Sequence, residues 1–125
     1  MKKGLQIPGA PAPIGPYSQA ILVQNTLYVS GQIPLDPVTG EWVNSSIADA
    51  THQVMKNLIA LVNEAGMDVD NIVKCSIFLS DMDNFAVMND VYGSYFGDVP
   101  PARETVEVAR LPKDVDVEIS CIAVR

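Results

Sequence analysis

The sequence is poor in the residues that bind metals and build thiol or imidazole catalysts. Its 125 residues include one histidine and two cysteines, and Cys75 and Cys121 stand in no C-x-x-C or other metal-ligand spacing. A zinc site and a Cys–His or Ser–His nucleophile therefore lack their necessary partners. We expect both thiols to be small buried groups that stay reduced, as is typical of cytoplasmic proteins.

Positive charge is also scarce. Eight lysines and arginines stand against fifteen aspartates and glutamates, which gives a net charge of −7. Nucleic-acid binding rests mainly on basic side chains that neutralise phosphates. Anionic membrane surfaces likewise attract basic segments. The composition therefore predicts that neither nucleic acid nor membrane is a partner.

Long apolar runs are missing as well. The opening stretch, MKKGLQIPGAPAPIGPY, has two lysines but no apolar run of the length found in a signal peptide. No stretch approaches the roughly 20 apolar residues that span a bilayer. We expect one cytoplasmic domain over residues 1–125, since domains of roughly 100–150 residues are the commonest size. At 48% hydrophobic residues, the composition also suggests a surface covered by another subunit.

The first half of the chain alternates between strand and turn signals before its first helix. Two strands are predicted at about 18–23 and 26–31, with a tight turn near Gln24 and Asn25. Residues 34–40, PLDPVTG, are typical of a turn-rich loop. These signals predict an antiparallel pair of strands behind an irregular N-terminal arm.

A helix follows this loop. Its apolar stripe has helical spacing and comprises Ile47, Ala50, Val54, Leu58, Leu61, Val62 and Ala65. Ser46 with Asp49 resembles a capping box, and Gly66 supplies a stop. His52 lies roughly 200° around the helix from Val54, so we expect it to face solvent.

The second half continues with a strand and a second helix. The strand at 71–80 has an apolar face formed by Val73, Cys75, Ile77 and Leu79. The helix at about 83–96 ends at Gly97, and its inner stripe is formed by Phe85, Met88, Val91 and Tyr95. With two closing strands the order is ββ-αβ-αβ-β, which predicts an α+β fold with one sheet and two helices packed on one face.

The closing stretch, PPARETVEVARLPKDVDVEIS at 100–120, is typical of a β-hairpin with charges in mid-strand. An antiparallel hairpin with a connection at 110–113 places Thr105 opposite Glu118. Arg103 and Glu118 are then diagonal neighbours on the face away from the helices. They form either a cross-strand ion pair, worth roughly 0.2–1 kcal/mol, or the charged groups of a site. Apolar residues on the same face suggest that another subunit packs there.

Four stretches carry a family pattern in the same order along nearly the whole chain. They are IGPYSQA at 14–20, VSGQIPLDPVTGE at 29–41, AGMDVDNIVKCSIFLSDMDNFAVMNDVY at 65–92 and PARETVEVARLPKDVDVEISCIAVR at 101–125. The chain resembles the RidA (YjgF) family of reactive-intermediate deaminases. The resemblance implies homotrimers of a chorismate-mutase-like α+β fold, with sheets facing inward and active sites between subunits.

The resemblance also implies a reaction. Family members hydrolyse enamine and imine intermediates, such as 2-aminoacrylate and its imine tautomer, to 2-oxo acids and ammonia without a metal or cofactor. Arg103 of the PAR motif would hold the substrate carboxylate, which suits a planar guanidinium. Glu118 would place or activate water, which suits a partly buried carboxyl group.

The remaining pocket residues are also implied by the resemblance. Tyr17 of the GPY motif and the backbone at Ser30 and Gly31 line the pocket, and Asn89 lies near it. Thr105 stands where many members have cysteine, so no essential thiol chemistry is expected.

Other functions stay open at this point. The same pocket fits a non-enzymatic trimer that binds small carboxylates, as a sensor or a chaperone-like protein. An endoribonuclease is a further alternative, although the net charge of −7 counts against it. An enzyme for larger or cyclic imines would differ only in the rim loops at 34–45 and 97–101.

Overall fold

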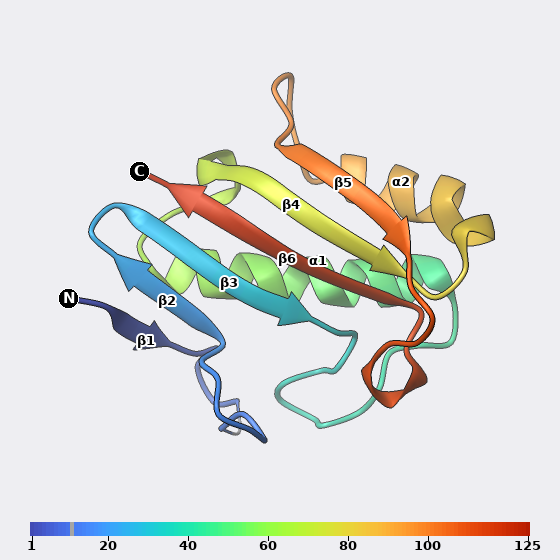
Figure 1. The fold of residues 1–125 in the computed structure, drawn as a ribbon, viewed down its shortest axis with the longest axis horizontal. Coiled ribbons are helices and arrows are strands. Elements are labelled where there is room, and N and C mark those ends of the chain that lie inside the picture. Colours follow the sequence, from blue (N-terminus) through green and yellow to red (C-terminus); the bar gives the residue numbers. More distant parts are fainter. Residues whose placement is uncertain (11) are drawn as a thin grey trace.

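The structure is a computed structural model that describes residues 1–10 and 12–125. One six-stranded sheet, in the order β1-β2-β3-β6-β4-β5, is covered by α1 and α2 on one face (Figure 1). The strands are β1 (Lys3–Leu5), β2 (Ala20–Val23), β3 (Thr26–Gln32), β4 (Ile72–Leu79), β5 (Ala102–Glu107) and β6 (Val117–Val124). The helices are α1 (Ile47–Glu64) and α2 (Phe85–Gly93). The predicted α+β class is confirmed, and β1 is an extra strand within the arm that was expected to be irregular.

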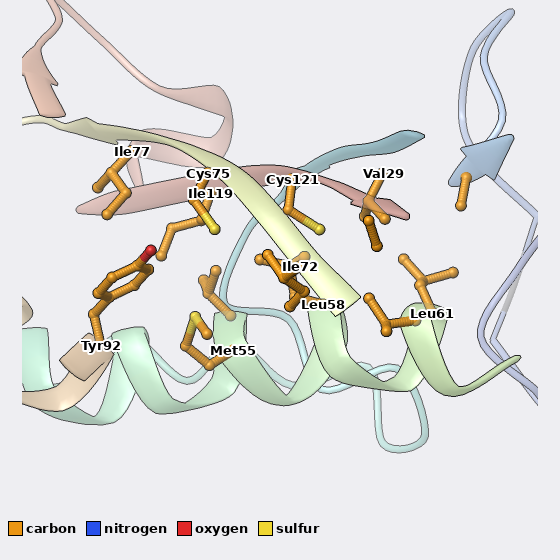
Figure 2. Packing of buried hydrophobic residues seen from close by; sticks show 14 of the residues in the cluster. Val29, Met55, Leu58, Leu61, Ile72, Cys75, Ile77, Tyr92, Ile119 and Cys121 are labelled. Carbon is orange, nitrogen blue, oxygen red and sulfur yellow. The ribbon is translucent and has the colours of Figure 1, made fainter. Parts of the chain in front are cut away.

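Helix α1 forms where the apolar stripe predicts it. The Ser46 side chain caps it by accepting a hydrogen bond from the Asp49 N–H at 3.1 Å, and Gly66, at φ +76°, follows its end. Met55, Leu58 and Leu61 project from α1 toward the sheet (Figure 2). Burying each such side chain stabilises the fold by roughly 1.5–3 kcal/mol, so this interface anchors the sheet.

Strand β4 departs from the predicted alternation at its start. Its register with β6 is irregular between Ile72 and Lys74, so Ile72 is buried while Val73 is 47% exposed. From Cys75 onward the predicted inner face is confirmed. The expectation for Val73 is wrong because parity counting cannot detect a bulge, which shifts every residue before it to the other face.

Helix α2 is shorter than predicted. A 3-10 turn at Met82–Asn84 precedes it, and it ends at Gly93. The residues that it buries are Met88 and Tyr92, so the stripe predicted from Phe85 to Tyr95 is only partly right. Tyr95 packs against the core from beyond the helix end.

His52 is not the solvated residue that was expected. Its side chain is half-buried, and Nδ1 lies 2.7 Å from the Tyr95 hydroxyl oxygen. The contact joins α1 to the segment that follows α2. The expectation is wrong because the helical wheel of α1 ignores a second helix packed beside it.

Strands β5 and β6 do not form the predicted hairpin. β6 lies between β3 and β4, antiparallel to both, whereas β5 lies beyond β4 and runs parallel to it (Figure 1). β4, α2 and β5 therefore form a βαβ unit. The side chains on the inner face of β6 are all buried: Val117, Ile119, Cys121 and Ala123. They pack over α1 at the centre of the sheet.

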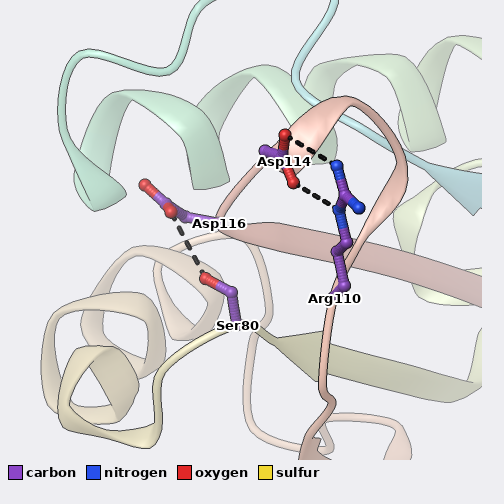
Figure 3. Close-up of polar contacts among 4 residues, drawn as sticks. All are labelled: Ser80, Arg110, Asp114 and Asp116. Carbon is purple, nitrogen blue, oxygen red and sulfur yellow. Dashed lines mark hydrogen bonds and ion pairs between the residues drawn. The ribbon is translucent and has the colours of Figure 1, made fainter.

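The connection from β5 to β6 crosses the end of β4. Arg110 and Asp114 close it through two contacts, Nε to Oδ1 at 2.7 Å and Nη2 to Oδ2 at 3.2 Å. The Ser80 hydroxyl donates to Asp116 Oδ1 at 3.3 Å (Figure 3), and the Ser80 N–H donates to the Asp116 carbonyl at 3.2 Å. These contacts seat the start of β6 against the end of β4.

Candidate functional site

The observed sheet order places Arg103 and Glu118 on opposite faces of the sheet. In register, Arg103 of β5 pairs with Cys75 of β4, whose partner on β6 is Cys121. Glu118 pairs with Phe78. Because paired residues share a face, Arg103 lies on the helix-bearing face with the buried cysteines, and Glu118 lies on the open face. The prediction that they are neighbours on one ribbon is wrong.

An open cleft with a volume of about 720 Å³ lies where β3 ends and β6 begins. The N-terminal arm and the loop after β3 form its other walls. Tyr17, Ser30, Gly31 and Glu118 all line this cleft. The structure thus brings together, from three separate segments, the pocket residues that the resemblance implied on this side of the sheet.

The Glu118 side chain packs over the backbone of Gly31. A Cβ atom on residue 31 would lie 2.7 Å from the carboxyl carbon of Glu118, so the glycine leaves the space that this carboxyl group occupies. The register of β3 with β6 is interrupted between Val29 and Gln32. This irregular backbone lets the cleft reach the main chain at Ser30 and Gly31.

The Glu118 carboxyl group is half-buried, and this burial raises its pKa above the usual range of glutamate. The ion pairs among the described residues are Lys74–Glu104 and Arg110–Asp114, so no cation offsets this effect. A carboxyl group whose pKa lies nearer neutrality can both accept a proton from water and return it. A general acid–base at this position would need such a raised pKa.

A second polar cluster lies on the other face, between β5 and α2. The Arg103 Nη2 donates to Asn89 Oδ1, and the guanidinium carbon lies 5.5 Å from the ring centre of Phe85 and 5.0 Å from that of Tyr92. Over the described part of the chain, Arg103 pairs with no carboxylate. A half-buried guanidinium held by rings and an amide, and lacking a counter-ion, is suited to bind a carboxylate ligand.

Thr105 belongs to this second cluster, two positions after Arg103 on the same strand face. The Thr105 hydroxyl is buried and finds no hydrogen-bond partner among residues 1–10 and 12–125. The Tyr92 hydroxyl is also buried and lies near the Cys75 thiol, a weak hydrogen-bonding group. Burial also raises the pKa of Tyr92, which keeps it a neutral phenol. Buried hydroxyls normally have partners, so the cluster has hydrogen-bonding capacity that the chain itself does not use.

Three residues near these clusters were missed from the sequence. Tyr92 lies one turn after Met88, and that i, i+4 spacing could have identified it. Asn57 of α1 is 4% exposed, and its place three residues after Val54 puts it on the buried face. Trp42, which lines the cleft, carried no sequence signal beyond being the single tryptophan.

The described residues contain no group of three or more histidine, cysteine, aspartate or glutamate side chains that could hold a metal ion. Within those residues, no helix has the length and apolar character needed to cross a membrane.

Comparisons with known proteins place the chain in a family. The profile of the family described as Endoribonuclease L-PSP matches residues 8–125. A RutC family protein of Pyrococcus horikoshii is 51% identical over 123 residues, which cover 98% of each chain. The 2-iminobutanoate/2-iminopropanoate deaminase of Bos taurus is 43% identical over 100% of this chain and 91% of its own. The crystal structure of E. coli TdcF with bound serine matches with a TM-score of 0.92 at 40% identity, over 98% of both chains. The chain belongs to the RidA/YjgF/L-PSP (RutC) family.

Proposed function

We propose that this protein is an enamine/imine deaminase that hydrolyses small 2-imino acids to 2-oxo acids and ammonia. The observation that carries the proposal is the pair of incomplete polar clusters. Arg103 has no carboxylate partner among the described residues, and Glu118 is a half-buried carboxyl group. The bovine relative named as an imine deaminase supports the reaction. The bound serine of E. coli TdcF supports a ligand of amino-acid size.

The active site is completed between subunits of a homotrimer. Arg103 lies on β5, the edge strand at one border of the sheet, whereas the Glu118 cleft is walled by the arm next to the other border. A contact between two different patches is heterologous, and such contacts form a ring when the rotation from one subunit to the next closes. In a ring, Arg103 of one subunit meets Glu118 of the next, and each cluster supplies what the other lacks.

The open face of the sheet supports assembly. It carries Tyr28, Val106 and Val124, which are 51%, 41% and 39% exposed. Apolar side chains gathered on one sheet face are typical of a surface that another subunit covers. When the open sheet faces of three subunits pack around a common axis, the edge strand β5 of each subunit lies next to a neighbouring subunit.

The chemistry follows from the two groups. Arg103 holds the substrate carboxylate through paired hydrogen bonds, which fixes C2 beside Glu118. Glu118 takes a proton from water as the water oxygen bonds to C2 of the protonated imine. The proton then passes to nitrogen, the C–N bond breaks and ammonia leaves. Glu118 takes the remaining hydroxyl proton as the oxygen becomes the carbonyl of the 2-oxo acid. Acid–base help of this kind contributes about 10²- to 10⁴-fold.

The test is a coupled assay in which a pyridoxal-phosphate-dependent dehydratase generates 2-aminoacrylate and its decay is followed. Wild-type protein accelerates the decay, and Arg103→Ala removes the acceleration while leaving the fold intact. Arg110→Ala is the matched control, because Arg110 is exposed and engaged with Asp114. Equal rates for wild type and Arg103→Ala would defeat the proposal. Retained binding of pyruvate with no turnover would favour a non-enzymatic carboxylate-binding protein.

A further inference from the structure

The wall of the cleft changes character away from Glu118. On the loop beyond the end of β3 it is apolar, with Ile33, Leu35 and Trp42. In a single subunit, before a neighbour completes the site, its volume of about 720 Å³ falls in the roughly 300–1,000 Å³ range of sites for drug-sized ligands. A three-carbon imino acid occupies a small part of such a space. The apolar half of the cleft is therefore available to something larger.

The loop that carries Trp42 is a well-ordered hairpin. Leu35 and Trp42 face each other in an antiparallel bridge. At the tip, Asp36 Oδ1 accepts from the Val38 N–H at 2.9 Å and the Thr39 N–H at 3.2 Å. Gly40, at φ +74°, completes the turn. The indole is thus presented by a defined scaffold, not by a loose loop.

Asn57 joins this hairpin to α1. Its Nδ2 donates to the Ile33 carbonyl at 3.2 Å and to the Leu35 carbonyl at 2.9 Å. Its Oδ1 accepts from Gln53 Nε2 at 2.9 Å. A buried amide with its donors and acceptor all engaged holds its partners in one geometry. The apolar wall therefore has its position set from the core.

The orientation of the ligand follows from the polar end of the cleft. Ser30, Gly31 and Glu118 gather there, and the carboxylate and the imine of a 2-imino acid both need polar partners. The side chain of the ligand is then directed along the apolar wall toward Trp42. Contact with an indole favours apolar side chains that are long enough to reach it.

We infer that the cleft selects its substrate by side-chain size, preferring 2-imino acids with a bulky branched or aromatic side chain over three-carbon ones. Trp42 is the specificity-determining residue, and Asn57 is a positioning residue that acts through the hairpin. The inference rests on the proposed function, since it names the substrate class of that same site.

The experiment compares imines made in situ from alanine, leucine and phenylalanine by an amino-acid oxidase. The surviving imine is trapped as its semicarbazone, and the readout is the ratio of kcat/KM for a bulky imine to that for the alanine-derived imine. Wild type gives a ratio well above one. Trp42→Ala lowers that ratio about 10-fold or more, because even one methylene in an apolar pocket is worth roughly 10- to 200-fold. Val38→Ala, on the same hairpin but 82% exposed and outside the cleft, keeps the wild-type ratio.

Asn57→Ala tests the positioning role. A purely structural role would lower the active fraction and reduce all rates equally, so the ratio would stay unchanged. The inference expects the ratio to fall as it does in Trp42→Ala. It also expects the double variant to fall little further, because both changes act on one contact. An unchanged ratio in Asn57→Ala would overturn its role, and an unchanged ratio in Trp42→Ala would overturn the inference.

Failure of the proposed function is separable from failure of this inference. If wild-type protein hydrolyses no imine, the deaminase proposal falls, and calorimetric binding of 2-oxo acids then decides the inference. Pyruvate, 4-methyl-2-oxopentanoate and phenylpyruvate should bind with increasing affinity to wild type, and Trp42→Ala should flatten the series. A flat series for wild type would overturn the size selection.

Discussion

A subunit-mixing experiment tests the shared site directly. Arg103 and Glu118 lie on opposite faces of one sheet, so a functional pair needs two chains. Arg103→Ala and Glu118→Gln are each expected to be inactive alone. Mixed trimers regain activity wherever an intact arginine of one subunit meets an intact glutamate of the next.

The size of the recovery can be calculated. In an equal, random mixture, half of the subunits carry the intact arginine and half of their neighbours carry the intact glutamate. About one quarter of all sites are then complete in a cyclic assembly. With unequal mixing the recovered activity follows the product of the two fractions, so it peaks at equal amounts.

The two chains are co-expressed, and imine decay is measured on the whole population of trimers without selecting the mixed ones, because selection would change the expected fractions. As a control, the variant carrying both substitutions is mixed with wild type in equal amounts. A shared site leaves about one quarter of the sites active, whereas a site within one chain leaves about one half. No recovery from the single variants at any ratio, together with half activity in the control, would refute the shared site.

Three further predictions concern single residues. Gly31→Ala should reduce kcat by at least about 10-fold, because the new Cβ would lie 2.7 Å from the Glu118 carboxyl carbon; a full-rate variant would contradict this close contact. Burial raises the pKa of Glu118, so ionising this carboxyl group is harder in the folded state than in the unfolded state. The free energy of unfolding therefore falls as pH rises from the unfolded pKa of about 4.3 through the folded pKa. Below the unfolded pKa, Glu118 has no such effect. Urea unfolding should therefore find Arg103→Ala/Glu118→Gln more stable than Arg103→Ala at neutral pH and equal to it in acid, and a difference independent of pH would count against the assignment. The Arg103→Ala background is used because it removes the guanidinium that the next subunit would bring to Glu118. Ser46→Ala should lower the free energy of unfolding by about 1 kcal/mol because it removes the cap of α1, and Ser45→Ala, at an exposed position before the cap, should change it less.

Local patterns in the sequence predicted the fold class and most of the helices and strands. The stripe of α1 and its cap at Ser46 lie where they were predicted. The inner face of β6 is buried as its alternation indicated. The sequence could identify these features because each depends on residues within a few positions of one another, where period and capping are decided.

The sequence by itself therefore determined most of the helices and strands, most of their apolar faces and the presence of a guanidinium and a carboxyl group on the closing strands. Only the tertiary structure decided which strands pair, and with that which face each charged group occupies. The crossover through α2 puts β5 parallel to β4, and β6 enters the centre of the sheet. Strand pairing joins residues far apart in the chain, and no local period records it. For that reason Arg103 and Glu118 could be named from sequence, while their separation within one subunit could not.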